Sequence, residues 1–220
     1  MAPCTVHLTD ALPFLQALPD NAVDAIITDP PYGTGGWVGV GPSRTKRVRH
    51  AWDVWTTGWL DDAWRVSGGR VGLFCPTSRL ADLYAWAGDR TTRLCIWVKA
   101  NPRPQFSRRP AYGYEAFAVL GEVQPCAEPG KLFSDVITTA VESRRRLHPY
   151  QKPNSVCAWA VAMVCPAGGT VLDPFVGSGS TGAACRASGR GFIGVERDEG
   201  YFAVACERLQ VSQTADGAAG

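Results

Sequence analysis

The sequence predicts one α/β domain with a mostly parallel sheet covered by helices on both faces. Short apolar or β-branched runs recur along the chain, and stretches with helical spacing of apolar residues lie between several of them. Alternation of this kind is typical of doubly wound sheets. A length of 220 residues is enough for a full core and fits one such domain better than two.

Each expected element follows from a local pattern. The expected strands are short and mostly apolar or β-branched: 23–28, 70–75, 94–99, 115–120, 169–172 and 191–195. The expected helices are 80–87, with Ser78 as its N-cap, 155–165, 180–188 and 201–210. Residues 33–49 and 122–147 offer little to bury, so we expect irregular loops there. The domain should span residues 1–210, with 211–220 as a flexible tail.

Composition narrows the class of protein. The net charge is only +2, so a nucleic-acid surface would need local clustering of basic residues. The eight cysteines show no C-x-x-C spacing and lie mostly in apolar runs, which is typical of reduced core residues and speaks against a metal site. The sequence shows no signal-peptide pattern and no apolar run of membrane-spanning length. We therefore expect a cytoplasmic protein with no membrane partner.

A rigid turn with a carboxylate and an aromatic ring follows the first apolar run. The stretch reads ITDPPYG, in which Pro30 and Pro31 stiffen the backbone and remove two donors. Asp29 and Tyr32 should therefore emerge at the C-terminal end of the strand 23–28. In open α/β sheets this is the end at which ligands bind.

A glycine-rich turn follows a later strand. Gly177, Gly179 and Gly182 satisfy G-x-G-x-x-G, and Glu196 lies at the end of the next strand, where an acid can bind ribose hydroxyls. A turn that only lets a helix pack closely on the sheet is the simpler interpretation of such glycines. The strand before them, the helix after them and the distal acid together favour a nucleotide site.

The acids near this turn bear on which nucleotide binds. Asp173 stands just before the glycines, and Asp29 comes to the end of another strand of the same sheet. Two carboxylates would repel an anionic pyrophosphate and attract a cation. S-adenosylmethionine carries a sulfonium, an ammonium and a ribose, so on charge it suits the site better than NAD.

With both motifs, the chain resembles the DNA methyltransferases that modify adenine N6 or cytosine N4. DPPY at 29–32 is similar to their catalytic motif, and DPFVGSGST at 173–181 is similar to their cofactor motif. The catalytic motif comes first, which matches the permuted group called beta. HPYQKP at 148–153, WVK at 97–99, YE at 114–115 and GVE at 194–196 fall in that group's order. The resemblance covers nearly the whole chain.

This resemblance implies a Rossmann-like methyltransferase fold with one antiparallel strand and circularly permuted motifs. It also implies transfer of a methyl group from S-adenosylmethionine to the exocyclic amine of an adenine that is flipped out of duplex DNA. Asp29, Pro30, Pro31 and Tyr32 would be catalytic. The Asp29 carboxylate and the Pro30 carbonyl would each accept an amine N–H and direct the nitrogen lone pair at the methyl group, while Tyr32 stacks on the base.

The resemblance assigns a larger set of residues to the cofactor. Asp10 would meet the adenine ring, Glu196 the ribose, and Lys152 and Pro153 the methionine end. The full set of expected cofactor-binding residues is Asp10, Asp29, Lys152, Pro153, Asp173, Phe175, Gly177, Ser178, Gly179, Ser180, Thr181 and Glu196.

Three basic clusters are candidates for contact with DNA phosphates, although a solvated loop is the ordinary interpretation of such charges. The segment 122–147 is short for target recognition in the resembled group, which speaks against long recognition sequences. The basic residues are Arg44, Lys46, Arg47, Arg49, Arg103, Arg108, Arg109, Arg144, Arg145 and Arg146.

Several alternatives stay open at this point. A leading Asp in the catalytic motif is more usual for adenine and a leading Ser for cytosine N4 in the resembled group, so adenine is favoured and N4-cytosine is the alternative. An NAD-dependent oxidoreductase is one alternative function, but it gives the DPPY motif no role. A catalytically silent DNA-binding relative is another, but such a protein has no chemical need to keep the DPPY residues. Homodimers are common in the group, as are restriction-modification systems of bacteria and phages.

Overall fold

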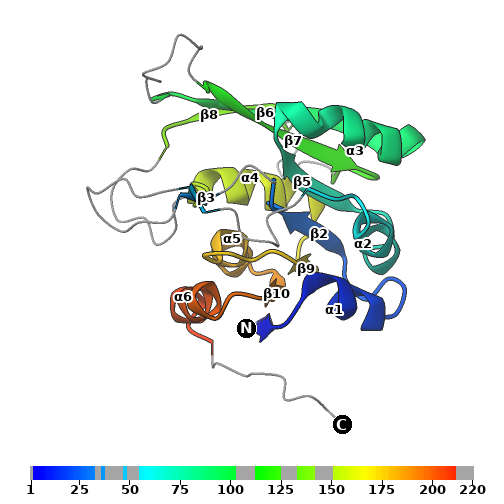
Figure 1. Ribbon diagram of the computed structural model, residues 1–220, viewed down its shortest axis with the longest axis vertical. Coiled ribbons are helices and arrows are strands. Elements are labelled where there is room, and N and C mark those ends of the chain that lie inside the picture. Colours follow the sequence, from blue (N-terminus) through cyan, green and yellow to red (C-terminus); the bar gives the residue numbers. More distant parts are fainter. Residues whose placement is uncertain are drawn as a thin grey trace.

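The computed structural model describes residues 2–32, 36–37, 47–48, 55–102, 112–124, 133–141 and 151–211. Within these residues a central sheet is covered by helices on both sides (Figure 1). The predicted doubly wound α/β class is therefore confirmed. Of 36–37 and 47–48 only the backbone is described.

The central sheet has the strand order β1-β10-β9-β2-β5-β7-β6-β8 within the described residues. Its neighbours pair in parallel except at β7, which runs antiparallel to both β5 and β6. The predicted mostly parallel sheet with one antiparallel strand is confirmed. The strands are β1 (Cys4–Leu8), β2 (Ala25–Thr28), β5 (Val71–Cys75), β6 (Thr91–Lys99), β7 (Tyr114–Leu120), β8 (Val136–Thr139), β9 (Thr170–Asp173) and β10 (Gly191–Glu196).

The helices divide between the two faces of the sheet (Figure 1). One face carries α4 (Asn154–Val164), α5 (Ser180–Ala187) and α6 (Glu199–Leu209). The other carries α1 (Ala11–Ala17), α2 (Leu60–Val66) and α3 (Leu80–Ala87). Each face has its own hydrophobic core, and β2 contributes Ala25 and Ile27 to one and Ile26 to the other. Burial on both faces explains why these strands read as continuous apolar runs.

Every strand and helix expected from the sequence is present, with boundaries shifted by up to three residues. Three local expectations are wrong. Ser78 does not cap α3, because it lies inside a 3₁₀ turn (Thr77–Arg79) and Arg79 takes the N-cap position. The segment 33–49 is not wholly irregular, because β3 (Gly36–Trp37) and β4 (Arg47–Val48) pair as a small antiparallel ladder. The segment 122–147 is not wholly irregular either, because it contains β8, which pairs in parallel with β6.

The cysteines of the described chain agree with the expected reduced state. Cys4 and six others are free thiols, and all of these except Cys4 are buried. No helix in the described part of the chain is long and apolar enough to span a membrane. In that same part, no three His, Cys, Asp or Glu side chains gather as possible metal ligands.

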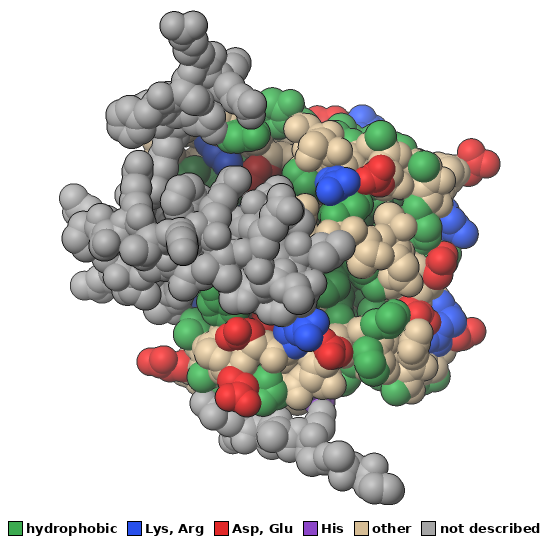
Figure 2. Space-filling view, in the orientation of Figure 1, with side chains coloured by type: hydrophobic (Ala, Val, Ile, Leu, Met, Phe, Trp, Pro, Cys, Tyr) green, Lys and Arg blue, Asp and Glu red, His purple; other side chains and the backbone are tan. Residues whose placement is uncertain are grey.

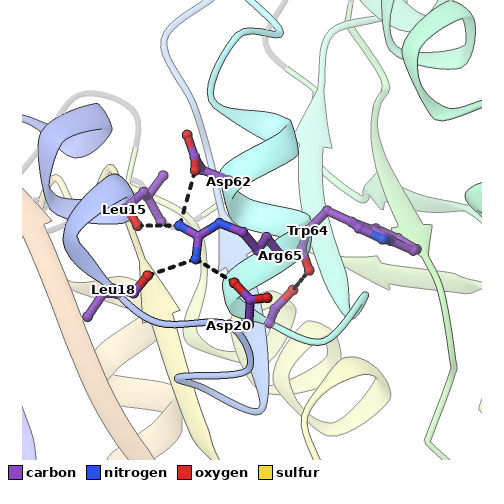
Figure 3. Close-up of polar contacts among 7 residues, drawn as sticks. Leu15, Leu18, Asp20, Asp62, Trp64 and Arg65 are labelled. Atoms are coloured by element: carbon purple, nitrogen blue, oxygen red, sulfur yellow. Dashed lines mark hydrogen bonds and ion pairs between the residues drawn. The ribbon is translucent and has the colours of Figure 1, made fainter.

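Arg65 of α2 holds the end of α1 in place (Figure 3). Its guanidinium donates to the carbonyl oxygens of Leu15 at 3.0 Å and Leu18 at 2.8 Å, and it pairs with Asp20 at 2.9 Å and Asp62 at 3.1 Å. Leu15 lies in the last turn of α1 and Leu18 is its C-cap residue, where carbonyl oxygens lack the amide partners that a continuing helix would supply. The Leu15 oxygen also accepts the Leu18 amide at 3.2 Å. This contact secures the helix that begins directly after Asp10.

Gly182 lets α5 pack close to the sheet. A Cβ atom at this position would lie 2.7 Å from the Phe192 ring and 2.8 Å from a Leu209 methyl group. Helix propensity alone predicts that Gly182→Ala stabilises the protein by about 1 kcal/mol. We expect the opposite sign, a loss of about 1–3 kcal/mol, because the core is overpacked. Urea denaturation of the two proteins decides between these signs, and a gain in stability would show that α5 has room to move.

Candidate active site

Four carboxylates lie at one edge of the sheet. β1, β10, β9 and β2 are parallel neighbours, so their C-terminal ends meet there. Asp173 ends β9 and Glu196 ends β10, while Asp29 directly follows β2 and Asp10 follows β1 after one residue. The DPPY turn (29–32) therefore emerges where the sequence predicts, beside the glycine loop.

Asp173 is the most buried of these acids and joins two strands. Its side chain accepts hydrogen bonds from the Thr28 hydroxyl at 2.6 Å and from the Phe175 amide at 3.1 Å, with the residue only 2% exposed. Burial raises the pKa of Asp173 to about 6, against the opposing effect of the hydrogen bonds from Thr28, Phe175 and Thr181. The carboxylate is costly to ionise in the ligand-free protein, so a cation bound nearby would be strongly favoured.

Glu196 is tied to the glycine loop. Its Oε2 accepts the Gly177 amide at 3.0 Å, and its Oε1 accepts the amides of Arg197 at 3.0 Å and Asp198 at 2.9 Å. Burial raises the pKa of Glu196, and these backbone hydrogen bonds oppose the rise. Each carboxylate oxygen has two lone pairs, so Oε2 retains capacity for a further donor such as a ribose hydroxyl.

The glycine loop has the backbone shape that only glycine adopts easily. Gly177 has φ +52° and Gly179 has φ +75°, both in the left-handed region. A Cβ atom on Gly177 would meet nothing within 4 Å, so the loop faces open space at this point.

Arg208 of α6 braces the same loop, a role that the sequence motif alone did not reveal. Its guanidinium lies 3.2 Å from the Ser178 carbonyl oxygen and 3.0 Å from the Ser180 hydroxyl. It also donates to Asn154 of α4 at 2.8 Å. The loop is therefore positioned by two helices besides its own.

The DPPY turn (29–32) contacts a lysine from a distant part of the sequence. The Asp29 carboxylate accepts the Tyr32 hydroxyl on Oδ1 and the Lys152 ammonium on Oδ2. Burial first, and then the Asp29 charge, raise the pKa of Tyr32 well above its ordinary value, so the phenol stays protonated as a donor. The Trp55 ring stands near Tyr32, with ring centroids 6.4 Å apart.

Lys152 belongs to a row of alternating charges. Its ammonium lies 3.1 Å from Glu115 of β7, and the second Glu115 oxygen lies 2.6 Å from the Lys99 ammonium at the end of β6. Burial works to raise the pKa of Glu115, but Lys152 and Lys99 outweigh it and lower that pKa to about 2. Burial likewise works to lower the pKa of Lys152, yet Asp29 and Glu115 raise it overall. Glu115 and Lys152 are therefore both charged at neutral pH.

The remaining predicted residues take varied positions. The Asp10 side chain is about half exposed and forms an ion pair with Arg197 at 3.1 Å. Arg197 directly follows Glu196 in the sequence. Phe175 packs edge-to-face on Trp59 with ring centroids 5.1 Å apart. Pro30 is buried in the DPPY turn, Pro31 is partly buried, and Pro153 is the N-cap residue of α4. Ser178, Ser180 and Thr181 are buried in the glycine loop and first turn of α5.

The side chains predicted to contact DNA lie outside the described part of the structure. Arg47 lies in β4, where only the backbone is described, and the others lie outside the described residues. On the face seen in Figure 2, the acidic and basic side chains of the described residues are interspersed, without a continuous basic patch. Ion pairs such as Arg70 with Glu122 and Arg93 with Asp135 show the same mixing.

Asp173 should make the protein less stable as the pH rises. Its pKa is about 6 in the folded protein and about 4 in the unfolded chain. Between these two pH values the folded state binds the Asp173 proton more tightly than the unfolded chain does. Protonated Asp173 therefore contributes to the free energy of unfolding below about pH 4, and this contribution is lost as the pH rises to about 6. We expect Asp173→Asn to remove this loss. The stability difference between variant and wild type should then be more favourable at about pH 8 than at about pH 5, by on the order of 1–2 kcal/mol.

Urea denaturation of both proteins at the two pH values tests this expectation. Other titrating groups are shared by the two proteins, so their effects cancel in the difference. An equal difference at both pH values would contradict the assignment of a raised pKa to Asp173.

The mostly parallel sheet, the glycine loop and the four carboxylates at the C-terminal ends of the strands are typical of a Rossmann-like α/β enzyme of the nucleotide-binding class. A family model described as DNA methylase matches residues 122–207. The putative methylase YubD of Escherichia coli (strain K12) is 30% identical over 218 residues, which cover 94% of this chain and 90% of that protein. The chain therefore belongs to the DNA methylase family, the N6/N4 amino-methyltransferases.

Two further proteins show the same likeness over most of the chain. The type II methyltransferase M2.DpnII of Streptococcus pneumoniae is 26% identical over 241 residues, covering 93% of this chain and 88% of that protein. The crystal structure of the M1.HpyAVI–SAM complex matches with a TM-score of 0.71 at 25% identity, covering 94% of this chain and 100% of that one. The family's cofactor is S-adenosylmethionine.

Proposed function

We propose that the protein transfers a methyl group from S-adenosylmethionine to the N6 amine of an adenine in duplex DNA. The observation that carries this proposal is the position of Asp29. Its carboxylate lies at the C-terminal end of β2, beside the strand that leads into the glycine loop, so base and cofactor would meet at one edge of the sheet. Site-specific methylation within a restriction-modification system is part of the proposal.

The residues at this edge fit S-adenosylmethionine. Gly177 leaves open space in front of the loop, and the Asp173 and Glu196 carboxylates attract a ligand that carries positive charge. We propose that Asp173, Phe175 and the loop 177–181 hold the methionine end, that Glu196 holds the ribose, and that Asp10 contacts the adenine ring. The bound cofactor supplies the methyl group on its sulfonium.

Side-chain and backbone groups of the DPPY turn, the proposed catalytic turn, orient the amine. Asp29 carries the acceptor oxygens, and Lys152 stabilises its negative charge. In the proposed arrangement, the Asp29 carboxylate and the Pro30 carbonyl accept the two amine hydrogens, which frees the nitrogen lone pair for attack. The Tyr32 ring supplies a stacking face for the flipped base, worth about 1–3 kcal/mol.

The leading Asp of the catalytic motif favours adenine, and cytosine N4 is the second candidate base. Incubation of the purified protein with methyl-labelled S-adenosylmethionine and unmethylated duplex DNA, followed by digestion to nucleosides, identifies the modified base by mass spectrometry. We expect labelled N6-methyladenine. Labelled N4-methylcytosine would retain the mechanism and change the base. Intact cofactor binding with no label in DNA would overturn the proposal in favour of an RNA substrate or a catalytically silent relative.

The proposal also includes DNA contacts, the oligomeric state and the location in the cell. We infer that the basic clusters at 44–49, 103–109 and 144–146 contact DNA phosphates, as local clustering must compensate for the low net charge. A homodimer in the cytoplasm of a bacterium or phage-infected cell completes the proposal. Sedimentation with and without duplex DNA measures the oligomeric state directly.

A further inference from the structure

We propose that Glu115 is a positioning residue, the second counter-ion of the Lys152 ammonium, which leaves the Asp29 carboxylate available to the target amine. The inference rests on the proposed function of Asp29. It goes beyond that function because it assigns a role to a strand residue that is not part of either the catalytic turn or the glycine loop.

The ammonium of Lys152 has two carboxylate partners. Its side chain is only 9% exposed, it sits 4.8 Å from the centre of the Phe74 ring, and it contacts carboxylates of both Asp29 and Glu115. A buried ammonium is stable only when it is paired and hydrogen-bonded. If Asp29 were its only counter-ion, the ammonium would compete with the target amine for the same oxygens.

The row of alternating charges has no net charge and ends at Lys99. Two ammonium groups, Lys99 and Lys152, alternate with two carboxylates, Glu115 and Asp29, so the four charges sum to zero. Lys99 holds the second oxygen of Glu115 at 2.6 Å and is itself only 14% exposed. Glu115 is thereby fixed from one side and presents its other oxygen to Lys152.

The reversed direction of β7 makes this contact possible. Glu115 is the second residue of β7, and its neighbour Ala116 pairs with Cys75, the last residue of β5. An antiparallel strand starts at the edge where its parallel neighbours end. The start of β7 thus reaches the edge that carries Asp29, although β5 lies between β7 and β2 in the sheet.

Replacing Glu115 with Gln removes the charge and keeps the shape. We expect kcat for methyl transfer to fall by about 10–100-fold, since the Asp29 carboxylate becomes the only counter-ion of Lys152 and moves from its productive orientation. The dissociation constant for S-adenosylmethionine and the KM for DNA should change less than about twofold. Asp82→Asn is the matched control, because Asp82 forms a solvent-exposed ion pair with Arg79 at the start of α3, and it should not change kcat.

A double-mutant cycle separates positioning from a merely structural role. In the Lys152→Gln background, Glu115→Gln should have no further effect on kcat, because Glu115 acts through Lys152. Effects that multiply, or a rise in the KM for DNA as the main change, would overturn the inference. If Glu115→Gln does not fold, Glu115→Asp provides the same test, since it keeps the charge and shortens the reach to Lys152.

The wild-type assay keeps this inference distinct from the proposed function. If wild-type protein labels DNA and Glu115→Gln does so equally well, only the role of Glu115 is wrong. If wild-type protein binds S-adenosylmethionine but labels no DNA, the proposed function fails first, and the role assigned to Glu115 fails with it.

Discussion

Replacing Asp29 with Ala should abolish methyl transfer, with a loss of at least about 10³-fold, and leave binding of S-adenosylmethionine largely in place. The change removes the oxygens that orient the target amine at the moment of transfer, and oriented groups of this kind are typically worth about 10²–10³-fold each. Lys152 keeps Glu115 as a partner at 3.1 Å, so its ammonium is not left unpaired in the variant. The fold should therefore survive.

Two measurements check this prediction together. Methyl incorporation into DNA reports on transfer, and isothermal calorimetry reports on cofactor affinity. Asp82→Ala removes a carboxylate from an exposed ion pair on α3 and serves as the control that should keep both. Loss of cofactor binding as the main effect of Asp29→Ala would contradict the role in orienting the amine.

Replacing Gly177 with Val should reduce affinity for S-adenosylmethionine by at least about 100-fold, equivalent to about 2.7 kcal/mol of binding free energy. Gly177 has φ +52°, and a side chain there would project into open space within the loop that we assign to the methionine end. The side chain would occupy the path of the ligand. The backbone strain of a β-branched residue in the left-handed region adds about 1–2 kcal/mol of destabilisation.

Gly189→Val is the control that separates the effect of backbone strain from obstruction of the cofactor site. Gly189 also has a left-handed backbone, φ +69°, and a Cβ atom there would meet nothing within 4 Å, but it lies in the turn before β10, at the opposite edge of the sheet. Thermal melting should show similar destabilisation of both variants. Calorimetry should show cofactor binding lost only in Gly177→Val, and equal affinities in the two variants would refute the placement of the ligand.

The elements predicted from the sequence are those with strong local patterns. β2, β5 and β9 are nearly or wholly buried, so their apolar runs are continuous and easily recognised. Among the elements that were missed, β1, β8 and α1 bury little. β1 and β8 are edge strands with partly exposed side chains, and α1 buries only Leu15. α2 is seven residues long, too short for a clear helical period.

The sequence by itself determined where the two motifs lie relative to the sheet. Each motif directly follows an apolar run, and parallel strands end at a common edge, so Asp29, Asp173 and Glu196 had to meet there. That inference needs only local patterns and one rule of α/β architecture.

Only the tertiary structure decided which charges pair at that edge. Lys152 reaches Asp29 across 123 positions of sequence, and Thr28 reaches Asp173 across 145. Glu115 joins them because β7 runs opposite to its neighbours and begins where they end. Strand order and direction follow from burying both faces of the whole sheet, and no pattern within a single strand contains that information.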